Sequence, residues 1–276
     1  MNILHSRIKI GADKPFTVIH ASDTHITLAD ERDGERKVKL AERRTNCFPE
    51  SDEMFENLIK LQNETGDFLV YTGDLIDFVS LLNLEKAKEF ADKTDCFFAA
   101  GNHEFSLYVG EAKEDAAYRN QSLGKVQAVF NNDIRFSSRV VNGVNFVAVD
   151  NSYYFFEKYQ LDALKKEVEK GLPIVLCMHN PVYSEELYEH ILNKDGRDKP
   201  AYLMAVPEEK MKHYSPDRYE QQKADEITYE AYDYIVNEKL IKTVLAGHVH
   251  CPFEYPLGDK MQYGVGCTDV RTIEFI

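Results

Sequence analysis

Phe68-Leu69-Val70-Tyr71-Thr72-Gly73-Asp74-Leu75-Ile76-Asp77 is the stretch of this chain that decides its fold. It begins as a continuous apolar run, which is typical of a strand buried on both faces of a sheet. A glycine then lets the backbone turn sharply and delivers Asp74 just past the carboxyl end of the strand. In open α/β sheets that end is where ligands bind. The stretch therefore predicts a buried strand with a polar site at its end.

Repetition of this pattern strengthens the interpretation. A single Asp after a strand is more often a helix N-cap or a turn residue than a ligand. Four further apolar runs, however, lead into side chains that can bind a metal: Asp23 and His25, then Asn102, then His179, then His248 and His250. Five predicted strands thus each end in a metal-competent residue.

The composition excludes several classes of protein. With 276 residues, the chain is long enough for one large α/β domain or two small ones. Its formal charge of −14 argues against general binding to nucleic acid or anionic membranes, because basic surface drives both. No apolar run approaches the roughly 18 residues of a membrane span, and residues 1–10 lack a secretory signal pattern. The five cysteines show no paired spacing, which favours reduced thiols and a cytoplasmic location.

The order of the predicted elements favours a layered α/β fold. Helices expected from residue 49 and over 84–93 alternate with the strands, which gives a β-α-β-α-β run. Apolar runs at 126–130, 134–136 and 144–149 have turn residues between them, so we expect antiparallel strands there. Further helices at 159–170 and 226–236 and three closing strands are also expected, the strands at 253–255, 261–263 and 271–275.

Two segments do not follow this alternation. The charged segment 30–44 is interpreted as an active-site loop or short helix, with Arg43 and Arg44 as candidates for gripping an anion. In 184–224 charges alternate with tyrosines and no buried strand is evident. A stretch this long between two metal-competent strands predicts a lid-like insertion over the site, within a single domain of residues 1–276. The alternative is that residues 184–224 form a surface segment with no functional role.

The metal-competent residues also predict a chemistry. Asp23 and His25 are two residues apart on extended chain, so their side chains point the same way and can bind one ion together. His248 and His250 can also serve as ligands at this site if each binds a different ion. Mixed carboxylate and imidazole ligands suit Zn, Mn, Fe or Ni rather than Ca or Mg alone. Two such ions, roughly 3.5–4 Å apart, hold a bridging hydroxide and clamp the oxygens of an in-line displacement, which is suited to hydrolysis at phosphorus.

Five blocks of the sequence resemble the ordered motifs of the calcineurin-like metallophosphoesterase superfamily. They are Asp23-Thr24-His25, Gly73-Asp74-Leu75-Ile76-Asp77, Gly101-Asn102-His103-Glu104, His179-Asn180-Pro181 and Gly247-His248-Val249-His250. The blocks span residues 16 to 251 in the family's order, and the third is the most specific. The fold that this resemblance implies is an α/β four-layer α-β-β-α sandwich, with a dinuclear metal site at the strand carboxyl ends.

The resemblance also implies a role for each matching residue. The first metal would take Asp23, His25, Asp74 and His250, and the second would take Asp74, Asn102, His179 and His248, with Asp74 bridging. His103 matches a non-ligand histidine that contacts the phosphate and protonates the leaving oxygen, and Asp77 matches the carboxylate that orients it. A structural histidine bonded to the backbone is the competing interpretation of His103.

The expected function is that of a metal-dependent phosphohydrolase acting on a small phosphomonoester or phosphodiester. Phosphoprotein phosphatases that resemble this pattern place an Arg directly after the second Asp, where this chain has Phe78. Bacterial-type phosphoesterases are therefore the nearer expectation. A non-catalytic scaffold with the same fold is one alternative, and a nuclease of the superfamily is another that the net acidity disfavours. The expected partner is a small phosphorylated substrate, without nucleic acid or membrane. Metal identity and oligomeric state stay open.

Overall fold

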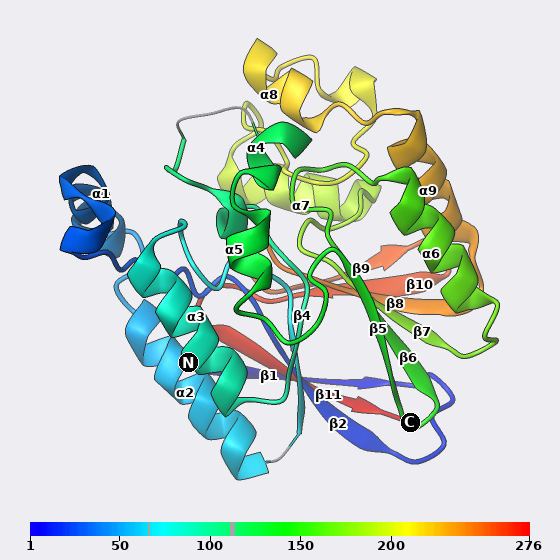
Figure 1. Cartoon of the computed structure of the whole chain (residues 1–276). Coiled ribbons are helices and arrows are strands. Elements are labelled where there is room, and N and C mark those ends of the chain that lie inside the picture. Colours follow the sequence, from blue (N-terminus) through cyan, green and yellow to red (C-terminus); the bar gives the residue numbers. More distant parts are fainter. Residues whose placement is uncertain (66, 111–113) are drawn as a thin grey trace.

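Two mixed β-sheets form the centre of the computed structural model, which describes residues 1–65, 67–110 and 114–276 (Figure 1). The first sheet has the strand order β1 (Asn2–Ile8), β11 (Asp269–Phe275), β2 (Phe16–Ala21), β3 (Phe68–Tyr71), β4 (Cys96–Phe98). The second has the order β5 (Phe136–Val141), β6 (Val144–Val149), β7 (Ile174–Cys177), β8 (Ile241–Ala246), β10 (Lys260–Gly264), β9 (Phe253–Leu257).

Parallel pairing brings the strand ends together. Strands β2, β3 and β4 run parallel, with Ile19 paired with Leu69 and Leu69 paired with Cys96. Strands β6, β7, β8 and β10 also run parallel to one another. Because parallel strands end at the same edge of a sheet, the loops after β2, β3 and β4 are neighbours, and so are those after β7 and β8.

The two faces of each sheet bury different cores. Val18, Val70 and Phe146 belong to the cluster between the sheets, whereas Ile19 and Leu69 belong to the cluster on the outer face of the first sheet. This alternation follows from the two-residue period of a strand. Both faces are buried, which explains why these strands appear in the sequence as continuous apolar runs.

Helices cover the outer face of each sheet (Figure 1). Helices α2 (Ser51–Thr65) and α3 (Leu81–Lys93) supply Phe55 and Phe90 to the outer core of the first sheet. Helices α6 (Lys158–Val168) and α9 (Glu226–Asn237) supply Leu161 and Ile235 to that of the second. The α-β-β-α sandwich expected from the sequence is therefore confirmed.

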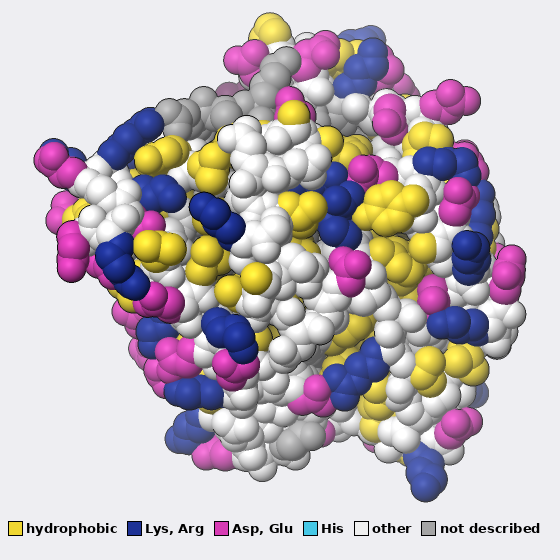
Figure 2. Space-filling model, in the orientation of Figure 1, with side chains coloured by type: hydrophobic (Ala, Val, Ile, Leu, Met, Phe, Trp, Pro, Cys, Tyr) yellow, Lys and Arg dark blue, Asp and Glu magenta, His cyan; other side chains and the backbone are white. Residues whose placement is uncertain are grey.

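Shorter elements complete the chain. They are η1 (Glu31–Asp33), α1 (Glu35–Thr45), η2 (His103–Phe105), α4 (Ala116–Asn120), α5 (Leu123–Gln127), α7 (Glu185–Asp195), η3 (Glu208–Lys210) and α8 (Pro216–Gln222). Helix α1 occupies most of the charged segment 30–44, for which a loop or short helix is expected. Within the described ranges, no helix is long and apolar enough to cross a membrane. Figure 2 shows acidic and basic side chains interspersed over one face of the molecule.

Two strands expected from the sequence, at 126–130 and 134–136, are wrong. The apolar run at 126–130, predicted as a strand, lies instead at the end of α5 and just beyond it. Its side chains Val126 and Phe130 pack into the outer core of the first sheet. A short apolar run does not distinguish a buried helix from a strand by periodicity alone. Of the run at 134–136, also expected as a strand, only Phe136 is in one, because β5 begins there; β5 is largely exposed, so its sequence lacks the buried pattern.

The segment 184–224 is a packed part of the molecule. Its residues Leu187, Ile191 and Val206 share a buried cluster with Val249 and Phe253, which follow β8. The backbone N–H of Met204 also donates to the carbonyl of Pro181, two residues after His179. The segment thus lies against the chain that carries three of the candidate ligands, His179, His248 and His250, and its action as a lid stays a prediction.

Candidate metal centre

The loops that follow the five strands carry an unusual backbone conformation. Among the described residues, nine non-glycine residues have positive φ, and five of these are candidate ligands: Asp23 (59°), His25 (51°), Asp74 (58°), His248 (70°) and His250 (50°). The left-handed region costs an L-residue of order 1 kcal/mol or more, so it persists only where the surroundings enforce it. Asp23 and His25 therefore do not lie on extended chain, as was expected from the sequence, and residues in this conformation cluster at functional sites.

A first group of ligand atoms comes from both sheets. Asp23, His25, Asp74 and His250 each offer one ligand atom, and these atoms lie within 4.8 Å of one another. His25 Nε2 is 3.1 Å from His250 Nε2 and 3.6 Å from Asp74 Oδ2. His250 Nε2 is 3.4 Å from Asp23 Oδ1. The structure thus brings together the four residues expected at the first metal.

A second group shares Asp74 with the first. Asp74, His179 and His248 also offer ligand atoms within 4.8 Å of one another. His179 Nε2 lies 3.1 Å from Asp74 Oδ2, 3.0 Å from His248 Nδ1 and 3.2 Å from Asn102 Oδ1. The residues expected at the second metal therefore converge as well, and a single oxygen, Asp74 Oδ2, faces both groups.

The protonation of these side chains fits metal binding. Burial lowers the pKa of His25 and of His248, and lowers that of His250 to about 4. Neutral imidazole is the form that coordinates metals. The pKa of His179 is raised to about 9, because the Asp74 carboxylate outweighs the effect of burial. A cation between these groups would take the place of that proton. Imidazole, carboxylate and amide oxygen together suit transition-metal ions.

Comparison with known families agrees with this geometry. The family described as calcineurin-like phosphoesterase matches residues 16–252. This chain belongs to that family. Membership makes it a phosphoester hydrolase in general terms, of a metal-dependent kind, and leaves its substrate unspecified. No curated protein sequence matches the chain at a significant level.

Solved structures are similar to this chain at low sequence identity. A dimetal phosphatase from Danio rerio is 12% identical with a TM-score of 0.52, over 92% of this chain and 88% of that one. The phosphopantetheinyl hydrolase of Mycobacterium tuberculosis is 12% identical with a TM-score of 0.45, over 91% and 90%. A candidate 5′-nucleotidase from Staphylococcus aureus is 13% identical with a TM-score of 0.46, over 92% of this chain but only 49% of its own length. This chain therefore spans about half the length of that nucleotidase.

Around the phosphoesterase site, a second layer of contacts fixes the histidines. His25 Nδ1 lies 3.0 Å from Asp77 Oδ1, and His179 Nδ1 donates to the carbonyl of Thr72 at 2.7 Å. His248 Nε2 lies 2.7 Å from the hydroxyl of Tyr154. A partner on the outer nitrogen fixes the tautomer and orientation of a ligating imidazole. Three of the candidate ligand histidines therefore present a chosen nitrogen to the site.

Asp77 connects this layer to His103. His103 Nδ1 lies 3.1 Å from Asp77 Oδ1 and 2.7 Å from the Asp77 carbonyl, so the side-chain and backbone contacts weighed from the sequence are both present. Burial would lower the pKa of His103, but Asp74 and Asp77 outweigh it and raise the pKa to about 10. These carboxylates therefore favour the protonated form of His103.

Arg44 from α1 completes the Asp77 cluster. Its Nε and Nη2 donate to the two Asp77 oxygens at 2.6 and 2.8 Å. Burial would raise the pKa of Asp77, but hydrogen bonds from Arg44, His103 and His25 outweigh it and hold the pKa well below its ordinary range. The anion that Arg44 grips is thus a carboxylate of the protein itself.

Glu104 fixes the positions of two strand-end loops relative to each other. Its carboxylate accepts the backbone N–H groups of Asp74, Leu75, Ile76 and Gly101 at 2.7, 2.8, 3.2 and 2.8 Å. It therefore joins the loop after β3 to the loop after β4, and so places Asp74 beside Asn102. Glu104 is part of the Gly-Asn-His-Glu block of the sequence, but the spacing of that block does not predict that its carboxylate joins two loops.

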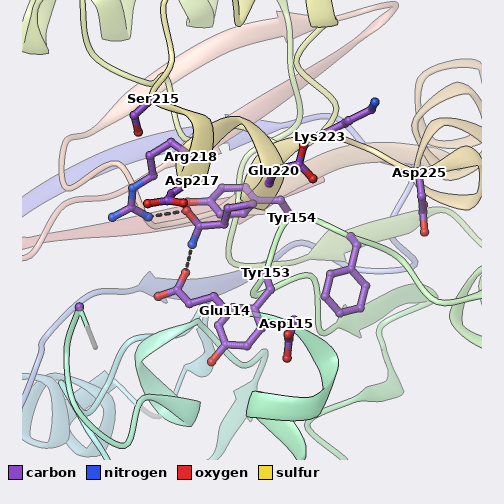
Figure 3. Close-up of a pocket in the computed structure, with 13 residues that line it drawn as sticks. Glu114, Asp115, Tyr153, Tyr154, Ser215, Asp217, Arg218, Glu220, Lys223 and Asp225 are labelled. Carbon is purple, nitrogen blue, oxygen red and sulfur yellow. Dashed lines mark hydrogen bonds between the residues drawn. The ribbon is translucent and has the colours of Figure 1, made fainter. Parts of the chain in front are cut away.

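Several side chains at the site have no signal in the sequence. The ring of Phe48, between α1 and α2, stacks on His25 with centroids 4.0 Å apart and an interplanar angle of 6°. A cavity of about 680 Å³, drawn in Figure 3, is lined in part by residues that contact the second group. Tyr154 and Glu114, which contact His248 and Asn102, are among its lining residues, and helix α8 forms another wall. These residues reach the site through tertiary packing alone.

Proposed function

We propose that this phosphoesterase uses two metal ions, one at each group, to hydrolyse a small phosphomonoester or phosphodiester. The shared oxygen Asp74 Oδ2 is the observation that carries the proposal, since it lies 3.6 Å from His25 Nε2 in one group and 3.1 Å from His179 Nε2 in the other. Bound divalent ions supply Lewis acidity and activate water for attack at phosphorus. Mn, Fe, Zn and Ni all suit the donor set.

His103 is the proposed general acid of the reaction. Asp77 holds its Nδ1, which leaves Nε2 as the nitrogen available to the leaving oxygen of the substrate. The two neighbouring carboxylates favour the protonated ring that such a role requires. Arg44 keeps Asp77 ionised, so Asp77 orients the imidazole and does not compete for its proton.

The cavity beside the second group is the proposed place for the organic part of the substrate. Helix α8 belongs to 184–224, and its residues Asp217, Arg218 and Glu220 line the cavity (Figure 3). The role proposed for 184–224 is therefore to shape this pocket. The several carboxylates of the lining disfavour a polyanion such as nucleic acid, which supports a small substrate over the nuclease alternative.

A substrate and metal panel tests the function. After chelation, the protein is assayed with p-nitrophenyl phosphate, bis-p-nitrophenyl phosphate and cyclic nucleotides, each with added Mn, Zn, Ni or Fe. We expect no hydrolysis by the chelated protein and restored hydrolysis of at least one phosphoester with one of these ions. His179→Ala should abolish that activity, whereas His213→Ala, at an exposed histidine outside the site, should keep it. Undiminished hydrolysis in the metal-free protein would refute the proposal, and inactivity with every ion would favour the scaffold alternative.

A further inference from the structure

The side chain of Asn102 is held at both ends of its amide group. Oδ1 lies 3.2 Å from His179 Nε2, on the side of the second ligand group. Nδ2 donates to Glu114 Oε1 at 3.5 Å on the other side. Only the oxygen of an amide can coordinate a cation, because the NH₂ end is a donor. A carboxylate at Nδ2 therefore selects the orientation that a metal ligand needs.

Glu114 is itself held by helix α8. Gln221 Nε2 donates to Glu114 Oε2, and Arg218 Nη1 donates to Gln221 Oε1, as the dashed lines of Figure 3 show. The Arg218 guanidinium lies over the ring of Tyr202, 5.6 Å from its centroid, and that ring meets the His248 ring edge-on at 5.9 Å. Helix α8 thus contacts Asn102 through Glu114, and it contacts His248 through Tyr202.

We propose that Glu114 is a positioning residue for Asn102, and that α8 holds Glu114 in place through Gln221 and Arg218. Glu114, Arg218 and Gln221 all line the cavity, so the substrate pocket and the second metal position form one structural unit. Within the described residues, no hydrogen bond joins Glu114 or α8 to Asp23, His25 or His250, the ligands particular to the first group. The proposal rests on the two-metal function proposed above.

The donor and acceptor pattern of this chain suggests a sharp test. Glu114 accepts from two donors, Asn102 Nδ2 and Gln221 Nε2. In Glu114→Gln one oxygen becomes an NH₂ donor, which must face one of those donors. Adding Gln221→Glu restores both pairs, because the new Glu accepts from Gln at 114 while the oxygen of that Gln accepts from Asn102. The double variant keeps the net charge of the natural chain.

Metal titration of the apoprotein is the measurement. Isothermal calorimetry with Mn²⁺ should show two ions per chain in the natural protein. In Glu114→Gln one of the two ions should bind about 10–100-fold more weakly, the usual cost of losing an outer partner of a metal ligand. The other ion should keep its affinity, and the double variant should recover both. Gln221→Ala, at a half-buried position on α8, should weaken the same ion.

Glu220→Gln is the matched control. Glu220 lines the same cavity from the same helix and is exposed, and its loss removes the same charge. We expect Glu220→Gln to leave both affinities unchanged. Equal loss in Glu220→Gln and Glu114→Gln would replace the positioning role with a general charge effect. Two ions in the natural protein with unchanged affinities in Glu114→Gln and Gln221→Ala would refute this inference alone. Fewer than two ions in the natural protein would refute the two-metal function as well.

Discussion

Asp77 shows how much of this site depends on a single side chain. Its two oxygens meet Arg44, His25 and His103, so one carboxylate orients both a candidate metal ligand and the candidate acid. Arg44 carries a permanent charge and a planar fork of donors, which matches a carboxylate at two points. Because Asp77 is fully buried, this pairing also compensates the cost of burying its charge.

At the scale of single residues, the variant His103→Gln should distinguish a role in proton transfer from a role in metal binding. We expect near-normal folding and metal content, because His103 belongs to neither of the two groups that share Asp74. It forms a third group with His25 and Asp77, where the Arg44 guanidinium already occupies the Asp77 carboxylate. The kcat should fall by about 10²–10⁴, the usual contribution of a general acid. The fall should be larger for alkyl phosphates than for p-nitrophenyl phosphate, whose leaving oxygen hardly needs a proton. His213→Gln, at an exposed histidine, is the control.

Two results would contradict this role of His103. Equal losses of kcat for alkyl and p-nitrophenyl esters would leave His103 with phosphate binding only. Loss of one metal ion in the variant would make His103 a ligand.

At the scale of elements, the strand-end loops approach one another too closely for side chains. Gly73 has φ +91°, and a Cβ there would lie 2.4 Å from the backbone nitrogen of Gly101. Gly73→Ala should therefore lower the free energy of unfolding by at least about 1–2 kcal/mol, the cost of the left-handed region alone. Urea unfolding measures this change. Gly124→Ala is the control, since Gly124 lies in α5 with open space where a Cβ would lie, and Ala is about 0.5–1 kcal/mol more stable than Gly within a helix. Equal stability of the two variants would contradict the close approach of the loops.

The helices and strands also show which parts of the structure could be predicted from the sequence and which could not. The apolar runs that became β2, β3 and β7 were recognisable because both faces of each strand are buried. The run at 126–130 was misassigned because burial alone gives no period. The candidate ligands could be chosen because each follows a strand. Tyr154 and Glu114 could not, since each reaches the site from a helix or loop whose position depends on tertiary packing. The sequence indicated Arg44 as an anion-binding candidate, but not its partner, Asp77.

At the scale of the whole molecule, the candidate metal centre lies where the two sheets meet. Asp23, Asp74 and Asn102 follow strands of the first sheet, whereas His179, His248 and His250 follow strands of the second. Ligand atoms from both sheets therefore converge only when the sandwich is assembled. An ion that binds the folded state alone stabilises it by mass action, so reconstitution with metal should also raise the melting temperature.

The metal content of the natural protein and of Asp74→Asn is the most direct test of a dinuclear centre. Elemental analysis after reconstitution with Mn²⁺ and removal of free ion should give two ions per chain, since Asp74 Oδ2 faces both ligand groups. Asp74→Asn should bind both ions more weakly, whereas Asp259→Asn, at an exposed carboxylate, should keep two. One ion or none in the natural protein, or loss of only one ion in Asp74→Asn, would contradict a bridged pair.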